Sequence, residues 1–147
     1  MATLKQEREQ AKKSLMIPLI FVGILWVIKL VELSFGVSFS DWGIFPRRWS
    51  GLVGIVTTPF IHGGDRGEVL GNFAHLFSNS LPLIVLGFVV FNAYQKIAWK
   101  LIAFIWLVGG LWVWAGARPS YHIGASGLVY GLAFFVFFSG VFRKDIR

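Results

Sequence analysis

Four long apolar runs, separated by shorter polar segments, dominate the pattern of the chain. They lie at about 15–33, 72–94, 97–115 and 125–142. Each is close to the roughly 20 residues that a helix needs to cross the hydrocarbon core of a bilayer. The pattern therefore predicts an all-α fold, a polytopic membrane helix bundle with four transmembrane helices.

Polar segments flank this pattern at both ends. Residues 1–14 are hydrophilic, and we expect a cytoplasmic segment that forms a short, frayed amphipathic lead into the first span. Residues 143–147 form a basic cytoplasmic tail. Near the end of the first run, Lys29 and Glu32 are three residues apart, so a helix places them on one face. We interpret them as an interfacial pair whose side chains snorkel toward the headgroups.

The segment 34–71 does not fit a further span. Glycine and proline recur through it, together with Trp42, Phe45, Trp49 and Phe60. Aromatic side chains favour the boundary between hydrocarbon and water, and a loop of this length is usually functional or disordered. Because it is too apolar for disorder, we predict a loop that lies on the outer membrane surface.

Composition narrows the class of protein. The chain has 147 residues, of which 56% are hydrophobic and only 14% are charged, against about 25% charged in an average soluble domain. The absence of cysteine excludes disulfides and thiolate chemistry. The net charge of +7 raises the possibility of a nucleic-acid partner. However, the basic residues lie beside the apolar runs, so we expect the lipid bilayer as partner and no nucleic acid.

The distribution of Lys and Arg predicts the orientation. Of 14 such residues, nine flank the runs on one side, four lie on the other side, and Lys29 is within the first run. The nine are Lys5, Arg8, Lys12, Lys13, Lys96, Lys100, Arg143, Lys144 and Arg147. Under the positive-inside rule both termini are cytoplasmic. The long loop, the start of the second run and the start of the fourth run then share the outer side.

Polar residues that could take part in catalysis are predicted to lie at this outer side. His75 and Asn79 are four residues apart and project from one helical face. Ser126 opens the fourth run between Gly124 and Gly127, where the N–H groups of a helix start lack intrahelical acceptors. A hydroxyl, free N–H groups, an imidazole and a carboxamide can attack a carbonyl and hold the resulting oxyanion. Alternatively, the small residues serve only close helix packing, and Gly-x-Ser-Gly alone favours that interpretation.

Taken together, these motifs resemble a known family. The stretch Gly124-Ala125-Ser126-Gly127-Leu128-Val129-Tyr130, preceded by His75-Leu76-Phe77-Ser78-Asn79, is similar to the rhomboid intramembrane serine proteases of bacteria. Phe45-Pro46-Arg47-Arg48 and Thr57-Thr58-Pro59-Phe60-Ile61-His62-Gly63 also resemble bacterial members. The likeness covers about 45–142, a partial rhomboid domain with four of an expected six helices.

The resemblance implies a role for each residue. Ser126 would be the nucleophile, and His75 and Asn79 would line the oxyanion hole. Gly124 and Gly127 would support the site, Gly124 through a close packing contact, and Tyr130 would stack on the catalytic histidine. The implied substrates are transmembrane proteins, cut near their outer helix ends in the bacterial cytoplasmic membrane. Neither a metal nor an organic cofactor is implied.

Two departures from the family pattern affect this expectation. The family's general base is a histidine on the sixth helix, and this chain stops after the fourth run. We do not expect His62 or His122, which lie in loops, to replace it. The segment Gly64–Asn72 also looks like an insertion. We therefore predict that the chain is the N-terminal portion of a protease and is inactive alone. A rhomboid-like pseudoprotease that binds transmembrane clients without cleavage is the alternative, followed by a structural membrane protein.

Overall fold

The fold is built from helices alone. The computed structural model describes residues 3–63 and 69–142, with the side chains of residues 69, 70 and 72 left out. Its long helices are α1 (Leu4–Phe35), α3 (Val69–Ala93), α4 (Ala98–Gly116) and α5 (Ser126–Phe142). Within the described ranges no strand is present, and Ile44 and His122 form an isolated bridge. The predicted all-α helix bundle is confirmed.

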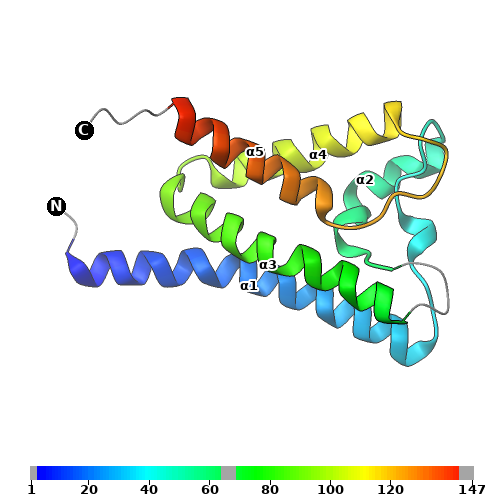
Figure 1. The fold of residues 1–147 in the computed structure, drawn as a ribbon, viewed down its shortest axis with the longest axis horizontal. Coiled ribbons are helices and arrows are strands. Elements are labelled where there is room, and N and C mark those ends of the chain that lie inside the picture. The colour runs from blue at the N-terminus through cyan, green and yellow to red at the C-terminus, as the bar shows by residue number, and fades with distance from the viewer. Residues whose placement is uncertain (1–2, 64–68, 143–147) are drawn as a thin grey trace.

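The long helices run back and forth between the two ends of the bundle (Figure 1). α1 and α3 lie side by side, and α5 contacts both α3 and α4. As a result, α1 begins and α5 ends at the same end of the molecule, while the 36–63 segment and the start of α5 occupy the opposite end. We refer to that opposite end as the loop end.

In the described part of the chain, three helices are long and apolar enough to cross a membrane, namely α1, α3 and α4. α5 is also apolar but has 17 residues. The first helix begins at Leu4, because Thr3 and Gln6 form a reciprocal capping box. The residues that follow are mostly good helix formers. The segment expected to be a frayed lead is therefore continuous with the first span.

The segment between α1 and α3 consists of short helical pieces. These are η1 (Ser40–Trp42), η2 (Trp49–Leu52), α2 (Val53–Thr57) and η3 (Thr58–Phe60). Two indole N–H groups of α4 hold them: Trp106 Nε1 donates to the Ile55 carbonyl at 2.7 Å, and Trp114 Nε1 donates to the Arg48 carbonyl at 2.8 Å. At Gly110 of α4, a Cβ atom would lie 2.8 Å from the Ile55 side chain. The segment thus packs directly on α4.

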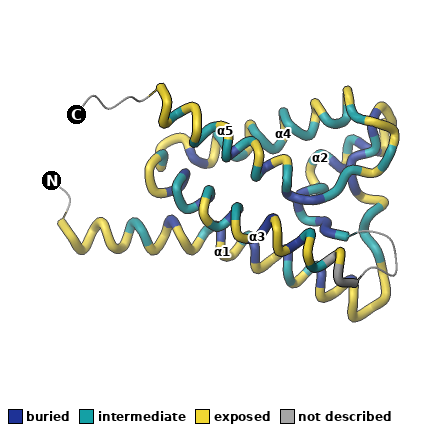
Figure 2. Tube along the Cα trace, viewed as in Figure 1, coloured by how far each residue is buried: buried dark blue, intermediate teal, exposed yellow. Residues whose placement is uncertain are grey.

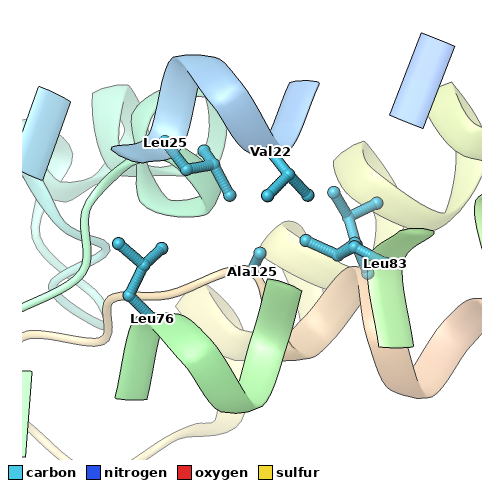
Figure 3. Packing of buried hydrophobic residues seen from close by; sticks show 6 residues of the cluster. Val22, Leu25, Leu76, Leu83 and Ala125 are labelled. Carbon is cyan, nitrogen blue, oxygen red and sulfur yellow. The ribbon is translucent and has the colours of Figure 1, made fainter. Parts of the chain in front are cut away.

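A small apolar core joins α1, α3 and the start of α5. Its buried members are Val22, Leu25, Leu76, Leu83, Ala125 and Leu128 (Figure 3). Figure 2 shows that burial concentrates between the helices and at the loop end, whereas the outer faces of the long helices are largely exposed. Exposed apolar side chains on these faces are what a helix bundle presents to lipid.

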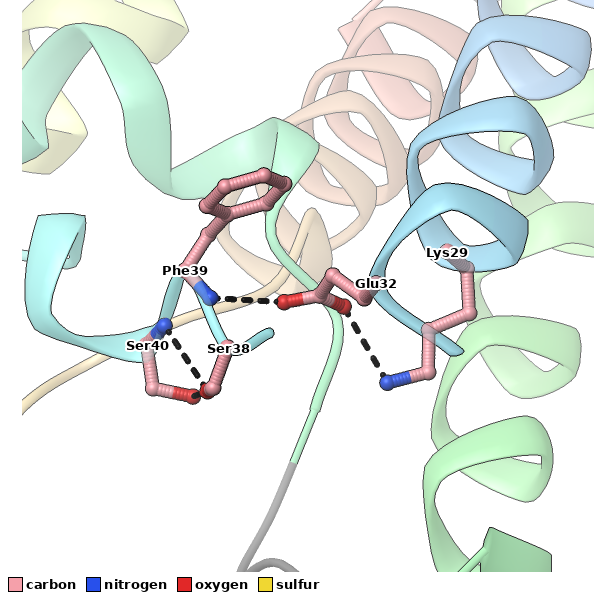
Figure 4. Close-up of polar contacts among 5 residues, drawn as sticks. All are labelled: Lys29, Glu32, Ser38, Phe39 and Ser40. Carbon is pink, nitrogen blue, oxygen red and sulfur yellow. Dashed lines mark hydrogen bonds and ion pairs between the residues drawn. The ribbon is translucent and has the colours of Figure 1, made fainter. Parts of the chain in front are cut away.

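Lys29 and Glu32 correct the sequence interpretation. Both side chains are buried, with 5% and 4% of their surface exposed, and Lys29 Nζ lies 3.1 Å from Glu32 Oε2. The other carboxylate oxygen, Oε1, accepts the Phe39 N–H at 2.8 Å (Figure 4). The expected snorkelling is therefore wrong. The pair points into the protein, because Glu32 is needed to bind the backbone of the chain that leaves α1.

Candidate functional site

The turn before α5 is held in place by the segment that follows α1. Ile44 and His122 exchange both of their backbone hydrogen bonds, at 3.0 and 2.8 Å. Thr58 adds two more: its hydroxyl donates to the His122 carbonyl at 3.0 Å, and its carbonyl accepts the Gly124 N–H at 3.1 Å. The position of Ser126 at the first residue of α5 is therefore set by contacts that are distant in sequence.

Gly124 occupies a position that only glycine suits. Its φ of +104° lies in the region that side chains rarely adopt. A Cβ atom there would lie 2.7 Å from His75 Nε2 and 2.9 Å from His75 Cε1. The structure thus brings the His75 ring against the backbone two residues before Ser126. This contact joins the two motifs that lie on separate helices.

Asn79 and His75 share one face of α3, as their spacing predicts. Asn79 is 4% exposed, and its Nδ2 donates to the His75 carbonyl at 2.8 Å. His75 is half-buried. Among the described residues neither side chain hydrogen bonds to Ser126. The structure therefore brings His75 to the turn before the serine but leaves Asn79 bonded to its own helix.

Ser126 opens onto a cavity of about 290 Å³ between α5, α4 and the loop end. Ser126 is half-exposed, and its hydroxyl has no hydrogen-bond partner in the described part of the chain. Gly127 and Tyr130 of α5 line the same cavity, together with Gly109 and Gly110 of α4. The Tyr130 residue is 67% exposed. The cavity therefore leaves space for a further group beside the serine and the tyrosine.

His122 is the loop histidine nearest to Ser126 in sequence. Its Nε2 lies 3.1 Å from the Arg118 carbonyl, so this ring nitrogen is engaged within its own turn. Although His122 lines the cavity, no hydrogen bond connects it to the serine hydroxyl in the residues described.

His62 is the residue whose importance the sequence did not reveal. It is 1% exposed, and its Nε2 accepts the N–H of Ala125 at 3.1 Å. Its ring centroid lies 5.3 Å from that of His75. Burial, assisted by the neighbouring His75, lowers the pKa of His62 to about 4, against the opposing effect of the Phe60 carbonyl. His62 is therefore neutral at physiological pH.

No sequence signal could have related His62 to Ala125, because the two residues are 63 positions apart and no repeat connects the loop that holds His62 to the start of the fourth apolar run. The expected insertion at Gly64–Asn72 falls partly on residues 64–68, which lie outside the described residues. Within the described ranges, no three His, Asp or Glu side chains gather as a metal site would need.

Comparisons with known proteins define the class. The Rhomboid domain family matches residues 49–146 of this chain. The chain is similar to uncharacterized proteins of Mycobacterium tuberculosis and Mycobacterium bovis, at 36% identity over 134 residues in each case. It is also 30% identical over 133 residues to an uncharacterized protein of Mycobacterium leprae. No solved structure matches the chain at a significant level.

These matches cover most of this chain but only about half of each relative. They include 86% of this chain but only 52% of the M. tuberculosis and M. bovis proteins and 49% of the M. leprae protein. The chain thus spans about half the length of the curated relatives it matches. The fold and the family match define a multi-pass integral membrane protein. The chain belongs to the rhomboid family.

Proposed function

We propose that this chain carries the nucleophile and oxyanion-hole half of an intramembrane serine endopeptidase. In the proposed reaction the Ser126 hydroxyl attacks a peptide carbonyl near the outer end of a transmembrane substrate helix. The hydroxyl proton passes to a base and then to the leaving amine, while the oxyanion accepts hydrogen bonds from the start of α5. Collapse of this intermediate breaks the peptide C–N bond and releases the amine, and water then hydrolyses the acyl-enzyme ester to free Ser126.

The observation that carries this proposal is the packing of His75 against Gly124. The left-handed turn at Gly124 brings an imidazole to the residues just before Ser126. At that point the first N–H groups of α5 have no intrahelical acceptor, and the helix dipole favours negative charge. A protein that used its glycines only for packing would have no need for an imidazole, a free hydroxyl and a cavity at the same helix start.

The proposed general base is a histidine of the whole protein that lies outside these 147 residues. Among the described residues, no hydrogen bond joins a base to the Ser126 hydroxyl, and an un-ionised serine without a base is a weak nucleophile. The 290 Å³ cavity beside Ser126 and Tyr130 has room for a side chain from a further helix. The greater length of the relatives supports such a helix in the whole protein. The 147-residue chain alone is then inactive.

The proposed setting is the bacterial cytoplasmic membrane with both termini inside. The asymmetry of basic residues supports this orientation, and so does the arrangement in which α1 begins and α5 ends at the same end of the bundle. Ser126 and the loop end then face the outer side. Water reaches the half-exposed hydroxyl from that side, without crossing the hydrocarbon core.

Reconstitution into liposomes with a model single-span substrate tests the proposal. The protein encoded by the complete open reading frame should cleave the substrate and should react with a fluorophosphonate at Ser126, and Ser126→Ala should abolish both. The 147-residue chain should show neither reaction. Cleavage by the short chain that depends on Ser126 would contradict the proposed external base.

Two further outcomes separate the alternatives. If the full protein binds the substrate but never reacts at Ser126, it is a pseudoprotease. Asn79→Leu distinguishes a packing role from a catalytic one, because Asn79 is 4% exposed and bonded to its own helix. A packing residue should tolerate leucine without loss of turnover. An oxyanion-hole residue should lose about 10²–10³-fold in turnover at unchanged expression.

A further inference from the structure

A buried histidine, His62, contacts the residue that precedes the candidate nucleophile. His62 is 1% exposed, and its Nε2 accepts the backbone N–H of Ala125, the residue that precedes Ser126. No other described side chain bonds to the backbone of residues 124–126. Through this contact the segment after η3 binds the peptide between Gly124 and Ala125, one residue before the serine.

The hydrogen bond determines the tautomer of His62. Because Nε2 accepts, the proton of the neutral ring must be on Nδ1. That nitrogen is buried and makes no hydrogen bond of normal geometry among the described residues, although the Phe60 carbonyl lies near enough to favour the protonated ring. A buried donor without a partner costs free energy. Against that cost, the ring accepts the buried Ala125 N–H, which an apolar side chain would leave without a partner.

We propose that His62 is a positioning residue. By accepting the Ala125 N–H it fixes the peptide between Gly124 and Ala125, which sets how the chain enters α5 and so directs the Ser126 hydroxyl into the cavity. The role in turnover rests on the proposed function. The role in ordering the turn does not. Gly124 has φ +104°, a conformation that glycine adopts without side-chain strain. The N–H of the next residue, Ala125, is held from outside the turn by His62.

This role ends when His62 is protonated. A proton on Nε2 would place two donors face to face, and the bond to Ala125 would be lost. The pKa of His62 is lowered to about 4, chiefly by burial and then by His75 of α3, with Lys29 of α1 adding to the effect. These are the ionisable groups that act on His62 from the packed helices. The turn before Ser126 should accordingly hold its order down to about pH 4.

Two substitutions separate the acceptor from the ring. His62→Gln keeps an acceptor near the place of Nε2 and cannot titrate in this range. His62→Phe keeps the ring volume, removes the acceptor and also removes the unpartnered Nδ1–H. If His62 served only packing, phenylalanine would be the better replacement. If it positions the peptide, glutamine would be.

The test compares the wild-type chain and both variants in bicelles by amide hydrogen exchange. The protection of the Ala125 amide should fall about 3- to 10-fold in His62→Phe, the range expected for one hydrogen bond, and should be kept in His62→Gln. In the wild type it should fall as the pH drops through about 4, and in His62→Gln it should not. Unchanged protection in His62→Phe would overturn the proposal.

Fluorophosphonate labelling of Ser126 in the protein from the complete reading frame tests the link to turnover. His62→Phe should label at least tenfold more slowly, and His62→Gln should label within about threefold of the wild type. Equal rates for wild type and His62→Phe, with the amide protection lost, would refute the positioning of the serine. If the wild type itself never labels, the proposed protease fails, while amide exchange still decides whether His62 holds the turn.

Discussion

The buried pair of Lys29 and Glu32 allows one prediction to be worked out in detail. Both side chains are at least nine-tenths buried, and their charged atoms are 3.1 Å apart. Breaking such a pair from one side leaves an unpaired buried charge, which costs about 3–5 kcal/mol, whereas replacing both partners by neutral groups is often close to neutral. The two partners should therefore be strongly coupled.

Glu32 also has a second role, which the choice of substitutions must respect. Its Oε1 accepts the Phe39 N–H at 2.8 Å, and glutamine keeps an acceptor there. Lys29→Met and Glu32→Gln should each lower the free energy of unfolding by about 3–5 kcal/mol. The double variant Lys29→Met/Glu32→Gln should recover to within about 1–2 kcal/mol of the wild type, because no charge remains unpaired.

A third variant isolates the contact with the loop. Lys29→Met/Glu32→Leu also removes the acceptor for Phe39, so it should be about 1–3 kcal/mol less stable than Lys29→Met/Glu32→Gln. The free energy of unfolding can be measured by steric trapping in bilayers or bicelles. The effects of the two single substitutions on the free energy of unfolding could instead add without coupling, or Glu32→Gln could lower it by less than about 1 kcal/mol. Either result would mean that the pair is exposed to water and that its assignment as a buried ion pair is wrong.

Three further predictions concern the site. Gly124→Ala should lower the free energy of unfolding by about 2–4 kcal/mol, through backbone strain and overlap with His75, while Gly23→Ala, which has open space around its Cβ, should be neutral in the same unfolding assay. His62 should make stability depend on pH: its pKa falls from 6.5 to about 4 on folding, so the unfolded chain binds more protons between these values. The stabilisation is thus complete above about pH 6.5 and is lost progressively as the pH falls to about 4, by about 3 kcal/mol in total. Unfolding titrations of wild type and His62→Gln should differ by this amount, and parallel curves would contradict it. Trp106→Phe should lower the free energy of unfolding by about 1–3 kcal/mol, because the Ile55 carbonyl loses its hydrogen bond from the indole N–H at 2.7 Å. Amide hydrogen exchange should increase in α2 more than in the rest of the protein. An exchange rate in α2 equal to that of the wild type would show that this hydrogen bond does not hold α2 in place.

The pattern of apolar residues was sufficient to predict the framework. Helix periodicity and span length depend on neighbouring residues and on the thickness of the bilayer, so the long helices could be found without knowledge of their contacts. The same local rule placed His75 and Asn79 on one face of α3. The charge asymmetry placed them on the same outer side as the start of α5. The contact of His75 with the turn at Gly124 could not be predicted from local pattern, because nothing local connects α3 to α5.

The tertiary structure determined the contacts of individual polar side chains, which the periodicity of the sequence does not predict. Whether Lys29 and Glu32 reach the headgroups or face inward depends on the chain that leaves α1, since Phe39 supplies the buried N–H that Glu32 binds. The role of His62 depends on a hydrogen bond between residues 63 positions apart. That bond can form because the 36–63 segment packs on α4 and because Ile44, within it, pairs with His122. The sequence by itself determined a membrane helix bundle with a serine at a helix start. The packing of an irregular segment, whose hydrogen bonds follow no repeat, determined what surrounds that serine.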